Sequence, residues 1–281
     1  MQKFLTDVHT HSAFSFDGKA PLVQMLQTAQ EKGLVFYGVS EHFDYDVEEE
    51  ERIRRKQFID EDGYFHDARH LQEDYAGCLN VLIGAEFGFA KDEKLWGRYA
   101  ATVKKHRPDF IVNSVHTRYG IDYHFNGAFR TADGGEDSSL GRKEILTGYL
   151  TDIRNSLDAP YPYDIVGHFG YVCRYLEKEK GKLRYEEFPD EIDDILQTII
   201  QKDKILEVNS SVYWLGGVSV TDESVLRRYF ELGGRKISFG SDAHAPERIA
   251  DKREGVTELL RKIGFTYVTV PCRGEHIKVE I

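Results

Sequence analysis

Histidines, carboxylates and, at one place, an asparagine follow short apolar runs at seven places along the chain. The first place is Asp7-Val8-His9-Thr10-His11, where two histidines stand two residues apart. Residues two apart on an extended backbone project to the same side, so His9 and His11 can bind one metal ion. The other places carry the same kinds of residue: Glu41-His42, Glu86, His116, His168, Asn209 and Asp242-Ala243-His244. Imidazole and carboxylate ligands without cysteine favour a catalytic zinc, manganese or iron site.

The apolar runs before these residues have the length of strands and alternate with helical patterns. Strands are predicted at residues 4–8, 34–40, 80–85, 109–115, 163–167, 205–208 and 236–239, with a further one at 267–270. Helices are predicted at 21–32, within the charged insertion 44–76, and at 95–106, 143–157, 191–201 and 223–232. This alternation predicts an α/β fold, a closed or nearly closed (β/α) barrel in a single domain. The carboxyl ends of barrel strands converge on one face, so the candidate ligands should meet there.

Composition excludes some classes of protein. The 281 residues carry 48 acidic and 37 basic side chains, a formal net charge of −11 that argues against a protein coating nucleic acid. The apolar runs are far shorter than the roughly 20 residues that span a bilayer, and no secretory signal is visible, so a cytoplasmic protein is expected. Cys78, Cys173 and Cys272 are odd in number and widely spaced, which favours reduced, buried thiols over disulfides.

Competing motifs are weak. His66 and His70 have the spacing of one helix face, but Asp67 stands where a metalloprotease has its glutamate, so a surface helix is predicted. The sequence contains no phosphate-binding loop, dinucleotide fingerprint or serine-nucleophile elbow.

Taken in order, the motifs from Asp7 to His244 resemble those of the polymerase and histidinol phosphatase (PHP) family. The resemblance implies one PHP-type domain over residues 1–281, a distorted TIM-like (β/α)7 barrel. It further implies three divalent metal ions, with zinc, manganese or iron left open, that hydrolyse phosphate esters without a side-chain nucleophile.

The resemblance also assigns metal ligands, position by position. The first metal would be held by His9, His11, Glu86 and Asp242, and Glu86 would bridge to a second metal held by His116 and His168. His42 and His244 would bind the third metal, together with Asp17, which stands where many relatives have a histidine. Asp7 and Glu41 are expected to orient imidazoles from behind.

Two arginines are candidates for binding phosphate. Arg118 follows His116 closely and Arg174 follows His168, so either could reach phosphate oxygens, or either could form a surface ion pair. The resemblance favours Arg174. Asp242 and His244 complete the predicted catalytic residues. Aromatic candidates for the leaving-group pocket, which could equally be core residues, are Phe14, Tyr119, Tyr123 and Tyr213.

The segment from Gly167 to Tyr175 is most similar to the histidinol-phosphate phosphatase branch of the family. The expected reaction is hydrolysis of L-histidinol phosphate to L-histidinol and phosphate, in histidine biosynthesis, with a small phosphorylated substrate as the partner. Two alternatives stay open. One is another phosphoester: a small phosphomonoester, a phosphotyrosyl protein or, despite the acidic charge, a nucleotide end. The other is a non-catalytic metal-binding scaffold. The oligomeric state and the role of the loop 120–141 are open.

Overall fold

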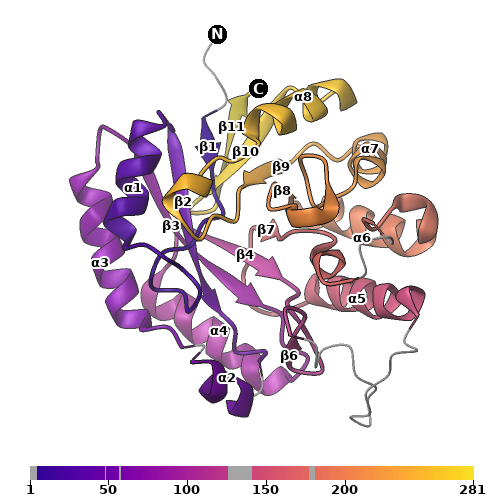
Figure 1. Cartoon of the computed structure of the whole chain (residues 1–281), viewed down its shortest axis with the longest axis horizontal. Coiled ribbons are helices and arrows are strands. Elements are labelled where there is room, and N and C mark those ends of the chain that lie inside the picture. The colour runs from indigo at the N-terminus through magenta and orange to yellow at the C-terminus, as the bar shows by residue number, and fades with distance from the viewer. Residues whose placement is uncertain (1–4, 48, 57, 126–140, 177–180) are drawn as a thin grey trace.

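The computed structural model describes residues 5–47, 49–56, 58–125, 141–176 and 181–281 (Figure 1). Seven parallel strands form one sheet in the order β1 (Thr6–Asp7), β2 (Phe36–Phe43), β3 (Asn80–Gly88), β4 (Phe110–Ser114), β7 (Ile165–Val166), β8 (Ile205–Asn209) and β9 (Ile237–Gly240). The sheet curls until β9 returns to β1, where the Val8 amide donates to the Phe239 carbonyl over 3.1 Å. The prediction of a nearly closed seven-stranded barrel is therefore confirmed.

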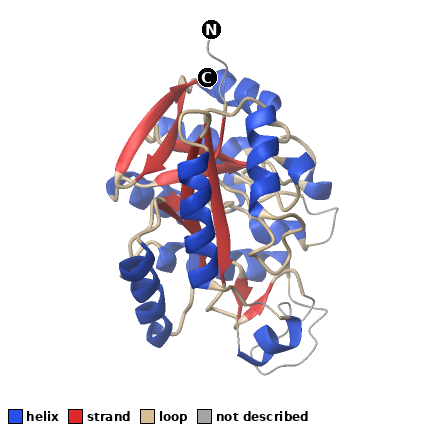
Figure 2. Cartoon of the chain, turned by 90° about the vertical axis from the view of Figure 1, so that its left-hand side faces the viewer, coloured by secondary structure: helices blue, strands red, loops and turns tan. Residues whose placement is uncertain are grey.

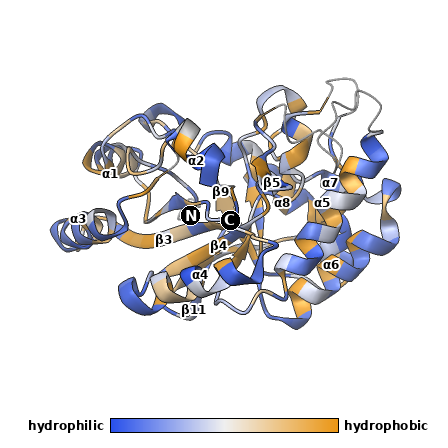
Figure 3. Cartoon of the chain, turned by 90° about the horizontal axis from the view of Figure 1, so that it is seen from below, coloured by the Kyte–Doolittle hydropathy of each residue, from blue (hydrophilic) through white to orange (hydrophobic). Residues whose placement is uncertain are grey.

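Helices cover the outside of the sheet (Figures 1 and 2). They are α1 (Leu22–Glu31), α2 (Glu49–Arg55), α3 (Glu61–Asp74), α4 (Glu93–His106), α5 (Arg142–Ser156), α6 (Pro189–Gln201), α7 (Glu223–Glu231) and α8 (Arg253–Ile263). Each long helix buries one apolar stripe: in α6 the buried residues include Ile192, Ile195 and Ile199, at helical spacing. Figure 3 shows the result, with hydrophobic strands β3 and β4 between helices that carry many hydrophilic residues.

The strand predicted at 267–270 exists, but it is not a barrel strand. It is β10 (Tyr267–Cys272), which pairs antiparallel with β11 (Glu275–Glu280) in a separate two-stranded sheet. Arg273 and Gly274 have φ values of 51° and 84°, and this pair of positive angles is what a tight hairpin turn requires. Val270 of β10 packs with apolar side chains of the barrel interior, among them Val8 and Phe110, so the hairpin contributes to the interior core.

A second hairpin lies in the loop after β4. Its strands are β5 (Thr117–Arg118) and β6 (Ile121–Asp122), and Tyr119 and Gly120 turn between them with φ values of 53° and 75°. Most of the loop 120–141, residues 126–140, lies outside the described residues.

Smaller predictions have mixed outcomes. His66 and His70 are exposed on α3, as a surface helix requires. All three cysteines are free thiols, but only Cys173 is buried, whereas Cys78 is exposed. Among the described helices, none combines the length and the apolar character that spanning a bilayer needs.

Candidate metal centre

All nine residues predicted as metal ligands lie at one end of the barrel. The strand order brings residues from distant parts of the sequence side by side: β2 and β3 pair in a register that sets His42 beside Glu86. The histidines His9 and His11 follow β1, and Asp242 and His244 follow β9, its neighbour across the closure. The Asp242 amide donates to the His9 carbonyl over 2.8 Å, which fixes the two segments against each other.

Glu86 is the centre of the cluster. Its Oε1 atom lies 3.3 Å from His9 Nε2, 3.1 Å from His116 Nε2 and 3.0 Å from His168 Nε2. Its Oε2 atom lies 3.1 Å from His42 Nδ1 and 3.5 Å from His11 Nε2. One carboxylate thus touches five imidazoles, which is the arrangement expected of a bridging ligand.

Two aspartates extend the cluster, and both lie beside His244. Asp242 Oδ1 lies 3.5 Å from His11 Nε2 and 3.9 Å from His9 Nε2. Asp17 Oδ2 lies 3.1 Å from His244 Nε2, while its Oδ1 lies 3.8 Å from His42 Nε2. The ligand atoms therefore form three overlapping groups, each with all members within 4.8 Å: His9, His11 and Glu86; His42, Glu86 and His116; His11, His42 and His244.

Charge and burial strongly perturb these groups. Burial would raise the pKa of Glu86, but the neighbouring histidines His9, His116 and His42 hold it well below its usual value. Burial would likewise raise the pKa of Asp242, yet Arg174 holds it well below the ordinary range. Burial and the charges of His42 and His244 lower the pKa of His11 well below its usual value. Ionised carboxylates and a neutral His11 are the forms that bind a metal.

The donor set fits divalent cations. Five buried atoms of the predicted ligands have no hydrogen-bond partner among the described residues, and all but Nδ1 of His168 contact one another in the cluster: Nε2 of His9, Nε2 of His11, Nδ1 of His42 and Oε2 of Glu86. Buried polar atoms without partners are costly, and here they belong to adjacent side chains of one cluster. A divalent ion would satisfy these four, and imidazole with carboxylate suits zinc, manganese or iron.

Two carboxylates that the sequence analysis did not identify hold the imidazoles from behind. Glu207, in the middle of β8, places Oε1 2.6 Å from His9 Nδ1. Asp44, just after β2, places Oδ1 3.0 Å from His116 Nδ1. Such contacts fix the orientation of a ligand ring. The signal that could have identified Glu207 is a carboxylate inside an otherwise apolar strand.

Gly240 makes the Glu207 contact possible. A Cβ atom at Gly240 would lie 2.1 Å from Glu207 Oε1 and 2.6 Å from His9 Cβ. Any residue other than glycine at position 240 would therefore force the carboxylate or the imidazole to shift.

The expectation that Asp7 and Glu41 orient imidazoles is wrong for Asp7. Glu41 reaches an imidazole only indirectly, through a serine. Asp7 accepts hydrogen bonds from the amide and hydroxyl of Ser241, at 2.9 and 2.6 Å, and so anchors the turn before Asp242. Glu41 accepts a hydrogen bond from the Ser15 hydroxyl, which lies 3.2 Å from His11 Nδ1.

A cavity of about 180 Å³ opens in front of the cluster. Arg174 lines this cavity, and its Nη1 and Nη2 atoms both lie 3.0 Å from Asp242 Oδ2. Arg118 is not among the lining residues: its guanidinium lies 5.0 Å from the Tyr119 ring centre and 3.9 Å from Glu144. The hairpin of β5 and β6 directs it away from the cluster.

Aromatic side chains form much of the cavity wall. Of the four predicted aromatics only Tyr213 lines it; Phe14, Tyr119 and Tyr123 do not. The other aromatic lining residues, which sequence reasoning missed, are Phe16, Phe125, Tyr171 and Tyr175.

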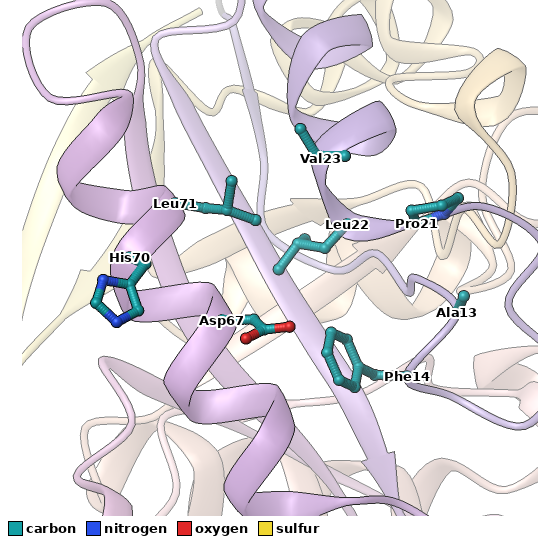
Figure 4. Close-up of a pocket in the computed structure, with 8 residues that line it drawn as sticks. All are labelled: Ala13, Phe14, Pro21, Leu22, Val23, Asp67, His70 and Leu71. Carbon is teal, nitrogen blue, oxygen red and sulfur yellow. The ribbon is translucent and has the colours of Figure 1, made fainter.

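A second hollow lies between α1 and α3 and has a volume of about 500 Å³ (Figure 4). Phe14, Leu22 and Leu71 project into it, and Asp67 and His70 stand on its α3 side. None of the nine predicted ligands lines this groove. Its apolar lining offers little for binding a metal or a phosphate.

Comparison with known proteins agrees with the motifs. Residues 7–211 match the model of the PHP domain. The chain belongs to the PHP-domain family. Among curated PHP-domain relatives, a "Probable histidinol-phosphatase" of Clostridium acetobutylicum is 25% identical over 86% of this chain and 88% of that protein. A "Histidinol-phosphatase" of Lactococcus lactis is 24% identical over 92% of this chain and 91% of that protein.

A solved structure shares the barrel. The Lactococcus lactis histidinol phosphate phosphatase, solved with zinc, L-histidinol and phosphate, superposes with a TM-score of 0.83 at 22% identity. The match covers 98% of this PHP-domain chain and 99% of that protein. The similarity establishes the fold along the chain.

Proposed function

We propose that this PHP-domain chain is a metal-dependent phosphomonoesterase that hydrolyses L-histidinol phosphate to L-histidinol and phosphate. The observation that carries the proposal is the convergence of nine histidines and carboxylates in one cluster, six of which line one cavity together with Arg174. The names of the curated relatives, which align over most of the chain, support the choice of substrate.

The cluster would hold three divalent metal ions. His9, His11, Glu86 and Asp242 would hold the first; Glu86, His116 and His168 the second; and His42, His244 and Asp17 the third. When bound, such ions activate water and neutralise charge on phosphoryl oxygens. Zinc is present in the solved Lactococcus lactis relative, and manganese and iron suit the same donors.

Side chains of the chain itself would orient the metal ligands and present a positive charge to the substrate. Glu207 and Asp44 accept hydrogen bonds from the Nδ1 atoms of His9 and His116, which leaves the Nε2 atom of each ring directed at Glu86. Arg174 presents a fixed positive charge to the cavity, because Asp242 and Asn209 hold its guanidinium in place. We assign it, with Asp242 and His244, to the catalytic residues, and we place Arg118 outside them.

The decisive experiment measures metal content and phosphate release on the same purified protein. Elemental analysis should find divalent metal, and the metal-loaded protein should release phosphate from L-histidinol phosphate. Chelation should abolish the release and added metal should restore it. His116→Ala should be inactive, whereas the matched His70→Ala, on the exposed face of α3, should keep wild-type activity.

Parallel assays define the substrate. L-Histidinol phosphate should be hydrolysed with higher kcat/KM than a phosphotyrosyl peptide or a nucleoside monophosphate. A metal-loaded protein that releases no phosphate from any of these esters would refute the enzymatic proposal and favour a metal-binding scaffold.

A further inference from the structure

Among the described residues that line the cavity, one carboxylate is no part of the metal cluster. Asp122, in β6, is buried and lines the same cavity as His116, His168 and Arg174. The β5–β6 hairpin holds it in place: Asp122 pairs with Thr117, and the Tyr123 amide donates to the His116 carbonyl over 2.9 Å. The carboxylate is thus fixed by the backbone that carries a metal ligand.

Among the described residues, Asp122 has no lysine or arginine partner, and the nearest positive charges that act on it are those of His116 and His42. Its Oδ1 atom accepts hydrogen bonds from the His124 amide at 2.8 Å and from the Tyr171 hydroxyl at 3.4 Å. Within the described part of the chain, no lysine or arginine forms an ion pair with Asp122; Arg118 and Arg174 pair with Glu144 and Asp242 instead. Burial, partly offset by the charge of His116, raises the pKa of Asp122 above that of a free aspartate. A buried carboxylate without a cationic partner is costly, unless a ligand supplies the cation.

Tyr171 connects this carboxylate to the metal cluster. Its ring stacks on His168, with centres 4.6 Å apart, and its hydroxyl donates to Asp122. Tyr175 donates to the Tyr171 hydroxyl over 3.1 Å. The cavity is therefore lined by two kinds of group: ligands for cations that attract phosphate, with Arg174, and the carboxylate of Asp122 beside tyrosine rings, which themselves attract cations.

We infer that Asp122 forms a subsite for the protonated amine of the substrate, and that the enzyme selects phosphate esters of amino alcohols. This inference rests on the proposed function, because it assigns the leaving-group side of the same cavity. A dianionic phosphate at the metal ligands and Arg174, with an ammonium at Asp122, would match the charges of these lining residues. A charge-assisted hydrogen bond from the ammonium to Asp122 would then distinguish such esters from uncharged alkyl phosphates.

The test compares two substrates that differ only in the amine: L-histidinol phosphate and its des-amino analogue, imidazolylpropyl phosphate. Metal-loaded wild type should prefer the amine by about tenfold or more in kcat/KM. In the nearly isosteric Asp122→Asn the preference should collapse to about twofold or less, and Asp122→Glu should restore part of it. Asp67→Asn, an exposed carboxylate in the groove of Figure 4, is the matched control and should keep the wild-type preference.

The outcomes separate the inference from the proposed function. A wild type that turns over both esters equally, or an Asp122→Asn variant with normal metal content that keeps the full preference, overturns the amine subsite but leaves the phosphatase intact. If L-histidinol phosphate is not hydrolysed, the same comparison is made with phosphoethanolamine and ethyl phosphate. No preference for phosphoethanolamine would then overturn the inference as well.

Discussion

The Nδ1 atom of His9 lies 2.6 Å from Oε1 of Glu207, although 198 residues separate the two in the sequence. Both side chains are buried, and the amide of His168 donates to the other oxygen of the same carboxylate. Glu207 therefore fixes one predicted ligand by its side chain and a second by its backbone. The positions of His9 and His168 relative to Glu86 depend on this one residue of β8.

Replacing Glu207 by glutamine should weaken metal binding while the barrel stays folded. The amide cannot supply the negative charge that faces His9, and loss of such a supporting carboxylate typically costs about 10- to 100-fold in metal affinity. Titration against a competing chelator measures the change. Glu258→Gln, on the exposed face of α8, is the control. Equal affinities in the two variants would contradict the role given to Glu207.

Asp17→Ala should lower the metal content by about one ion per chain, because the third site would lose its only carboxylate. Asp17 lies in a loop with its side chain 41% exposed, so the fold should survive. Asp17→His should restore the ion and shift the preference from manganese or iron toward zinc. Elemental analysis of the three proteins tests this, and full metal content in Asp17→Ala would remove the residue from the site.

Arg174→Ala should raise the activation free energy for kcat/KM by about 2 to 4 kcal/mol. The loss removes the guanidinium from the cavity and leaves the buried Asp242 without its cation. Arg174→Lys should recover only part, since one ammonium cannot reproduce the contacts to Asp242 and Asn209. Arg118→Ala should have a much smaller effect. Steady-state kinetics on L-histidinol phosphate measures these effects. A larger loss of kcat/KM in Arg118→Ala than in Arg174→Ala would assign phosphate binding to Arg118 instead.

Asp46→Asn should make the free energy of unfolding less sensitive to a rise in pH between about 4 and about 8. Burial and the neighbouring charge of Asp44 raise the pKa of Asp46 to about 8. The folded protein thus holds a proton that the unfolded chain releases near pH 4, so wild-type stability should fall as pH rises from about 4 to about 8. The asparagine variant lacks this contribution, and its stability relative to wild type should grow by up to about 1.4 kcal/mol per pH unit in that interval.

Urea unfolding at pH 5, 7 and 9, with equal metal content in both proteins, measures the effect. Asp67→Asn supplies the control for an exposed carboxylate. A stability difference that is constant across the three pH values would show that Asp46 is charged in the folded protein at pH 5.

The sequence could predict that the proposed ligands converge because most of them follow strand ends, and parallel strands of a barrel present those ends together. Glu207 and Asp44 were missed because their partners, His9 and His116, lie far away along the chain. The family resemblance favoured Arg174, but the residues alone could not separate the two arginines, since the direction of Arg118 depends on a two-residue hairpin turn.

Near the C-terminus, local sequence patterns also failed to predict one helix and the pairing of one strand. Helix α8 was not predicted: its apolar stripe is only Val256, Leu260 and Ile263, set among charged residues and preceded by Gly255. The strand pattern of β10 was recognised, but only the turn at Arg273 and Gly274 determines that it pairs with β11.

The closure of the barrel brings His9 and His11, near the start of the chain, against Asp242 and His244, near its end. A growing polypeptide leaves the ribosome from its N-terminus, so the first histidines emerge long before their partners have been translated. A nascent chain can therefore hold metal at these residues only weakly, and a product released before Asp242 would lack a complete centre. Under the proposed ligand assignment, loading of the complete centre would follow translation of the chain through His244, and a full complement of metal would mark a chain in which the barrel has closed.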